Sequence, residues 1–204
     1  MIGIINYGLG NIKAFENIYN RLHIPVRILH HHEDFSEITK LILPGVGAFD
    51  HAMSTFNNSG MRDVTEKMIL EKNIPVIGIC VGMQMLAKSS DEGVLPGLGW
   101  INGVVKRFDE SKIDFDTHLP HMGWNDVDLD RNHILFTGFP ENPKFYFLHS
   151  YYFECLDESN IMAESYYGEK FTCAVVHKNI YGVQFHPEKS HMFGVKLLEN
   201  FSKL

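Results

Sequence analysis

The stretch PVIGICVGMQ, residues 75–84, constrains the fold more than any other part of the chain. It begins with an apolar run, typical of a buried strand, and residues 83–88 then have strong helix-forming composition. Cys80 stands between the two, with Gly78 and Gly82 two positions away on either side. Because side chains at those two positions would crowd a tight bend, the pattern predicts a strand-to-helix elbow with Cys80 at its tip.

Such an elbow would give Cys80 two properties of a nucleophile. The turn exposes the side chain beyond the strand end, and the N-terminus of the next helix favours a negatively charged thiolate. The same residues also fit a buried structural cysteine beside a glycine-rich strand end. Other parts of the chain have to decide between the two interpretations.

Composition limits the class of protein. The 204 residues are 45% hydrophobic and carry a net charge of −7 without a basic block, so we expect a full core and no nucleic-acid surface. No linker, repeat or membrane-length apolar run interrupts the chain, which predicts one domain over residues 1–204 and no membrane span. The three cysteines lack paired spacing, and the first residues read as a strand rather than a secretion signal. These features predict a cytoplasmic protein.

Strands and helices alternate over the first ninety residues, which favours a mostly parallel sheet flanked by helices in an α/β fold. The expected strands cover residues 2–6, 25–29, 41–43 and 74–79, and the expected helices cover 12–22, 49–56, 61–71 and 83–88. The second half predicts a largely antiparallel β portion, closed by a helix that begins near Ser190. Its strands are expected at 100–108, 124–129, 145–148, 151–154, 161–167, 171–176 and 181–185, with a polar loop over 109–118.

Two N-terminal patterns could indicate dinucleotide binding and metal binding, but each lacks residues that its function needs. Gly8 and Gly10 follow the first strand, but Lys13 stands where a dinucleotide-binding motif needs its third glycine. The histidines of residues 30–32 point in different directions on an extended segment and have no nearby ligand pair, which indicates a solvated strand end. We therefore expect neither a cofactor nor a metal ion.

A second motif supplies the base that a thiol nucleophile needs. Residues 186–190 read HPEKS, directly after the last expected strand. His186 titrates in the range required to take the thiol proton and return it to a leaving group. Glu188 can hold the other ring nitrogen, and Pro187 limits how far the pair can drift. A histidine near a glutamate is common, so only the combination with Cys80 predicts a triad.

The third motif is PGVG, residues 44–47, at the C-terminal end of a neighbouring strand. Glycines there let backbone N–H groups point at an oxyanion. Open α/β sheets bind ligands beyond the carboxyl ends of their strands, where this loop and the elbow are both expected. An ordinary strand-to-helix turn would have the same sequence.

Together these motifs resemble those of class I (triad) glutamine amidotransferases. They are GICVGMQ (78–84), PGVGAF (44–49) and GVQFHPEKS (182–190), supported by YGLGNI (7–12), PHMGWN (120–125) and FYFLHSYY (145–152). Within that family the whole chain is similar to the glutaminase subunits of imidazole glycerol phosphate synthases, from the histidine pathway. The resemblance implies a flavodoxin-like class I glutamine amidotransferase fold.

The resemblance also implies roles for matching residues. Cys80 would attack the side-chain amide of L-glutamine, giving a thioester and ammonia, with His186 as base and then acid and Glu188 orienting it. Water would then release glutamate. The backbone of Val46, Gly47 and Val81 would hold the oxyanion. The positions that match glutamine-binding ones are Gly47, Gln84, Ser150 and Tyr151.

A partner is implied as well, because this family passes its ammonia to a synthase, here a (β/α)₈ cyclase in a heterodimer. The partner-facing positions would be Asn11, Met122, Trp124 and Lys189. An exposed tryptophan suits a binding hot spot and a lysine can lie over its ring, whereas a core tryptophan and a solvated lysine are the alternative. We expect a slow isolated chain that the partner activates by turning the Val46 peptide.

Three positions depart from the usual family pattern: Asn6 replaces Asp, Val81 replaces Leu and His191 replaces Gln. None removes a catalytic group, but they leave open a paralogue that supplies ammonia to a synthase acting on cell-surface sugars. A γ-glutamyl hydrolase or peptidase of the same fold would act without a partner. A non-catalytic partner-binding module is the remaining alternative.

Overall fold

The computed structural model describes residues 1–113, 118–130 and 132–204. Its strands are β1 (Ile2–Ile5), β2 (Val26–Leu29), β3 (Lys40–Gly45), β4 (Val76–Cys80), β5 (Gly103–Arg107), β6 (His121–Asp126), β7 (Asp128–Leu129), β8 (Lys144–His149), β9 (Tyr151–Cys155), β10 (Ile161–Tyr167), β11 (Glu169–His177) and β12 (Ile180–Val183). Its α-helices are α1 (Ile12–Arg21), α2 (Phe49–Asn58), α3 (Arg62–Glu66), α4 (Val81–Gln84) and α5 (His191–Ser202), and a π-helical turn (Lys67–Glu71) continues α3. Single 3₁₀ turns cover His32–Phe35, Glu110–Lys112, Ile134–Phe136, Glu158–Asn160 and Pro187–Lys189.

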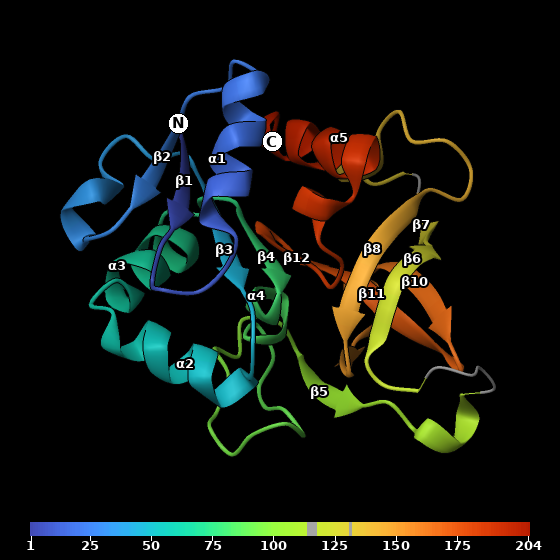
Figure 1. Ribbon diagram of the computed structural model, residues 1–204. Helices are drawn as coiled ribbons and strands as arrows, with labels where there is room; N and C mark the ends of the chain where they lie inside the picture. Colours follow the sequence, from blue (N-terminus) through green and yellow to red (C-terminus); the bar gives the residue numbers. More distant parts are fainter. Residues whose placement is uncertain (114–117, 131) are drawn as a thin grey trace.

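A central sheet organises the chain, in the order β2-β1-β3-β4-β12-β11-β10-β7 (Figure 1). The strands from β2 to β12 are parallel to their neighbours, and from β12 to β7 the pairing is antiparallel. Strands β9 and β5 branch from β11, while β6 and β8 form a separate antiparallel pair. The fold is therefore the α/β architecture that the sequence predicts, with an antiparallel second half.

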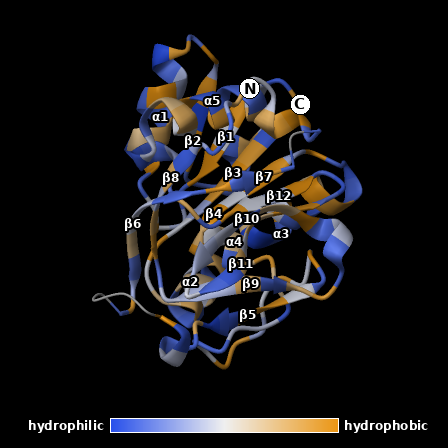
Figure 2. Ribbon diagram, turned by 90° about the vertical axis from the view of Figure 1, so that its right-hand side faces the viewer, coloured by the Kyte–Doolittle hydropathy of each residue, from blue (hydrophilic) through white to orange (hydrophobic). Residues whose placement is uncertain are grey.

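Helices cover both faces of the parallel part (Figure 1). Helices α1 and α5 lie together on one face, where the Tyr19 hydroxyl donates a hydrogen bond to the Leu198 carbonyl at 3.2 Å, and α2 and α3 lie on the other. The strands between them are apolar, as Figure 2 shows, and all four residues of β1 are buried. None of the described helices is long and apolar enough to cross a bilayer.

Several expected elements differ in extent. The helix expected over 83–88 ends at Gln84, because the Met85 carbonyl accepts the Leu98 N–H at 2.8 Å and the Lys88 N–H donates to Gly103 at 2.9 Å. Tertiary hydrogen bonds thus override helix propensity. The strand expected over 124–129 is two strands in different sheets, and that expected over 100–108 is only β5. Part of the polar loop expected over 109–118 lies outside the described residues.

Candidate active site

Cys80 lies at a strained turn between β4 and α4. Its backbone φ of 55° and ψ of −115° are values that residues other than glycine rarely adopt. A Cβ added to Gly78 would lie 2.5 Å from the Gly82 carbonyl oxygen, and one added to Gly82 would overlap the Leu43 carbonyl of β3. The two glycines are therefore required by close backbone approach, as their spacing predicts.

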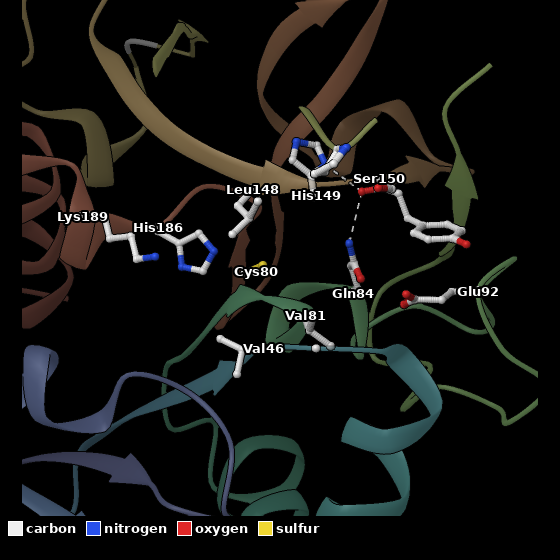
Figure 3. Close-up of a pocket in the computed structure, with 13 residues that line it drawn as sticks. Val46, Cys80, Val81, Gln84, Glu92, Leu148, His149, Ser150, His186 and Lys189 are labelled. Carbon is white, nitrogen blue, oxygen red and sulfur yellow. Dashed lines mark hydrogen bonds between the residues drawn. The ribbon is translucent and has the colours of Figure 1, made fainter. Parts of the chain in front are cut away.

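Three motifs meet at the carboxyl ends of neighbouring parallel strands. Gly78 pairs with Gly182 of β12, and Cys80 pairs with Gly45 of β3. This register brings the elbow, the HPE segment and the PGVG loop to one edge of the sheet, around a cavity of about 340 Å³ (Figure 3). Cys80, at 4% exposure, and His186 both line this cavity.

His186 forms hydrogen bonds to both other members of the predicted triad. Its Nδ1 lies 2.9 Å from Oε1 of Glu188, whose side chain is 2% exposed, and the ring also bonds to the Cys80 side chain. Burial alone would lower the pKa of His186, but its hydrogen bonds and charge interactions with Cys80 and Glu188 raise it to about 10. The ring is thus an imidazolium at neutral pH, with a proton to give to a leaving group.

The raised pKa of His186 makes the stability of the folded protein depend on pH. The protonated ring stabilises the folded state fully below the ordinary pKa of 6.5, and this stabilisation is lost as the pH rises through about 10.

The other histidine that lines the described cavity is electrostatically different. His149 Nδ1 lies 2.7 Å from the Tyr151 carbonyl oxygen, and its Nε2 lies 3.0 Å from Nδ1 of His121. Burial lowers the pKa of His121 to about 4, and burial with the nearby His121 lowers that of His149 to about 3. Both rings are neutral at pH 7, so His186 is the cavity imidazole suited to proton transfer.

The positions expected to hold an oxyanion and glutamine also line the cavity: Val46, Gly47, Val81, Gln84, Ser150 and Tyr151. Gly47 has a φ of 88°, a conformation that favours glycine. The Val81 N–H is at the first position of α4 and has no intrahelical acceptor. Both backbone segments therefore line the cavity that contains Cys80, and the Val81 N–H is not used within α4.

Glu92 lines the cavity but is missing from the sequence predictions. Its Oε2 accepts the Phe49 N–H at 2.8 Å, at the start of α2. Figure 3 shows Glu92 and Lys189 on opposite sides of Cys80. The carboxylate suits a cationic amino group, but its loop carries no motif, so only the fold reveals it.

The four expected partner-facing residues are exposed: Asn11, Met122, Trp124 and Lys189. Trp124 is 45% exposed and stacks on His191 at a centroid distance of 5.2 Å, while Lys189 Nζ lies 5.5 Å from the Tyr146 ring centroid. Lys189 thus lies over the Tyr146 ring and not over Trp124, whose ring packs against His191 instead.

A metal-binding arrangement is not found among the described residues, where no group of three or more His, Cys, Asp or Glu could hold an ion. The histidines of residues 30–32 are exposed at the end of β2, as expected for a solvated strand end.

Comparison with known proteins agrees with this fold and shows the family. The family model of class I glutamine amidotransferases matches residues 3–203, and the chain therefore belongs to the class I glutamine amidotransferase family. Imidazole glycerol phosphate synthase subunit HisH of Bdellovibrio bacteriovorus is 55% identical over 204 residues, covering 100% of both chains. The same subunit of Leptospira borgpetersenii is 49% identical, again over 100% of both chains.

Solved structures share the fold at low sequence identity. A glutamine amidotransferase crystal structure has a TM-score of 0.74 at 19% identity, with 100% of this chain and 99% of that chain covered. PurLQS from Thermotoga maritima has a TM-score of 0.74 at 15% identity, with 98% and 96% covered.

Proposed function

We propose that this chain is the glutaminase subunit of an imidazole glycerol phosphate synthase. It hydrolyses L-glutamine to glutamate and ammonia, and passes the ammonia to a (β/α)₈ cyclase subunit in histidine biosynthesis. The observation that carries the proposal is the hydrogen-bonded Cys80–His186–Glu188 arrangement at the cavity, in a chain 55% identical along its full length to a HisH subunit.

The chemistry proceeds in two halves. The Cys80 sulfur attacks the side-chain amide carbon of glutamine, and the Val81 N–H with the Val46–Gly47 peptide holds the resulting oxyanion. His186 gives its proton to the leaving nitrogen, so ammonia departs and a thioester remains. His186 then takes a proton from water, which attacks the thioester and releases glutamate and the thiol. Glu188 keeps the ring oriented and stabilises its charged form throughout.

The other end of glutamine is held across the cavity. Gln84, Ser150 and Tyr151 contact the backbone part of the substrate, and Glu92 pairs with its amino group. Both hydrogens of the Gln84 amide are bonded, to the Tyr151 carbonyl at 3.2 Å and to Gln184 at 3.0 Å, which leaves its oxygen for the substrate.

Glu92→Gln tests the amino-group contact. The amide oxygen can still accept the Phe49 N–H, but the charge is lost, so KM for glutamine should rise about 10- to 100-fold with kcat changed less than about threefold. Steady-state glutamate release in the assembled complex measures both constants. Glu158→Gln, an exposed carboxylate in a 3₁₀ turn, is the control and should behave as wild type. An unchanged KM in Glu92→Gln would contradict the contact.

The partner docks beside the mouth of the cavity. Met122 pairs across the β6–β8 ladder with Leu148, which lines the cavity, and Trp124 lies two residues further on β6. This apolar surface suits a heterodimer interface that keeps ammonia from solvent. The protein works in the cytoplasm as one domain, a location supported by three free cysteines.

The presence of histidine at position 191 favours a second candidate for the synthase that receives the ammonia. Its ring stacks on Trp124 at an interplanar angle of 14°, so a residue unusual for these subunits sits within the partner-facing surface. A paralogous glutaminase that feeds a synthase acting on cell-surface sugars would have the same triad and a different interface.

Reconstitution with the cyclase subunit tests the proposal. The complex should form product from glutamine, and the cyclase should raise the glutaminase rate at least about tenfold. Trp124→Ala should weaken the complex about 10- to 100-fold, because exposed tryptophans are frequent hot spots. Leu70→Ala, 52% exposed on the π-helical turn that continues α3, should not. If the cyclase neither binds nor activates this chain, the histidine-pathway assignment fails and the sugar-synthase alternative gains.

A further inference from the structure

The Cys80 sulfur has a second hydrogen-bonding neighbour besides the imidazole. Nε2 of Gln184 donates to Sγ of Cys80 at 3.7 Å. Gln184 is completely buried, one position beyond the end of β12 and two positions before His186. Its backbone N–H donates to the Cys173 carbonyl at 2.8 Å, which anchors the residue to β11.

The direction of the Gln184 amide follows from a chain of hydrogen bonds. The Tyr151 carbonyl can only accept, so the Gln84 group that faces it at 3.2 Å, the dashed contact in Figure 3, is the NH₂. The same NH₂ donates to Oε1 of Gln184 at 3.0 Å. Because Oε1 is held there, the NH₂ of Gln184 is the end directed at Cys80.

The Tyr151 carbonyl is itself fixed from the other side. Nδ1 of the neutral His149 donates to it at 2.7 Å, and Nε2 of His149 accepts from His121 at 3.0 Å. His121 in turn faces the Asn125 amide on β6, at 3.1 Å. A flipped Gln84 amide would therefore place its oxygen against the Tyr151 carbonyl oxygen and Oε1 of Gln184, and a flipped Gln184 amide would place its NH₂ against the NH₂ of Gln84.

We propose that Gln184 donates a hydrogen bond to the Cys80 thiolate and stabilises it, with its amide held in the donating orientation by Gln84 and the Tyr151 carbonyl. The role rests on the proposed glutaminase function and deepens it. A donor to charged sulfur stabilises the thiolate relative to the thiol. Since Gln84 lines the cavity and is proposed to bind glutamine, the residue that binds glutamine is also the residue that orients the donor.

Other titratable groups surround Cys80, and the same residues are present in wild type and in the Gln184 variants. His186 and Glu188 approach from the segment after β12, His149 from β8, and Tyr7 from the turn after β1, while Glu92 and Lys189 lie on the cavity wall. None of these is altered by a substitution at Gln184.

The test is the pH dependence of Cys80 alkylation by iodoacetamide in the full chain, followed by mass spectrometry of the peptide that contains Cys80. Gln184→Glu keeps the size and the oxygen that accepts from Gln84 but replaces the donor, and Gln184→Met removes both. The midpoint should rise by about one unit in Gln184→Met and further in Gln184→Glu. Gln84→Met should raise it by less, because the donor remains but is no longer held.

Asn200→Asp is the matched control for loss of a buried amide. Asn200 donates to the Leu135 and Thr137 carbonyls, both at 2.9 Å, from α5. This variant should have a lower Tm and an unchanged alkylation midpoint. Unmoved midpoints in Gln184→Met and Gln84→Met overturn the proposal, as does an equal shift in Asn200→Asp. Failure of the glutaminase function would instead appear as shifted midpoints in a chain that never hydrolyses glutamine with its partner.

Discussion

Replacing Cys80 with alanine should reduce glutamine hydrolysis by the assembled complex about 10⁴-fold or more. Without the sulfur no thioester can form, and the remaining backbone donors and His186 have only water to activate. Glutamate release at saturating glutamine measures the loss. Ammonium salts should still support product formation by the cyclase, because the substitution leaves the acceptor site intact.

Cys155→Ala is the matched control for the thiol. Cys155 is a free cysteine on β9, and burial raises its pKa to about 12, so it should be unreactive at neutral pH and its loss should leave the glutaminase rate near wild type. Glutaminase activity that survives Cys80→Ala with the partner present would exclude the thioester mechanism. Activity lost in Cys155→Ala would show that the thiol assignment is incomplete.

Replacing Gly82 with alanine should cost about 3 kcal/mol or more in the free energy of unfolding. The added Cβ would overlap the Leu43 carbonyl oxygen, a backbone atom of β3 that cannot rotate away, so α4 and β3 must separate. Urea unfolding followed by circular dichroism measures the change. The displaced α4 would also move the Val81 N–H, so the surviving folded protein should be a poor glutaminase.

Gly60→Ala distinguishes this overlap from the general cost of replacing glycine. Gly60 has a φ of 73° and nothing within 4 Å of its added Cβ, so only its backbone conformation is strained. The cost there should be about 1 kcal/mol. Equal losses at the two positions would mean that close backbone approach does not determine the elbow.

The fold was largely predictable where a pattern is local. The glycines around Cys80 predict the elbow because they act within five residues, and apolar runs predict the strands. The prediction of a helix over 83–88 was wrong because hydrogen bonds with residues 97–103 end the helix early. No local sequence pattern indicates these bonds. The parallel pairing of β12 with β4 was also hidden, since β12 follows strands that pair antiparallel.

The site was predictable to a similar extent. Cys80, His186 and the PGVG loop are recognisable as motifs, and strand polarity explains why they meet. Glu92 belongs to no motif and reaches the cavity only through the course of its loop. Gln184 stands inside a recognised motif, but its contact with Cys80 depends on the register of two strands, which the sequence alone does not reveal.

The place of β12 between β4 and β11 has a consequence during synthesis. Gln184 and Cys80 are 104 positions apart. The ribosome therefore synthesises Cys80 long before it reaches His186, two residues after Gln184. An unfinished chain carries the elbow but lacks the group that takes its proton. The triad is therefore complete only after the last strand has been synthesised and β12 has taken its place between β4 and β11.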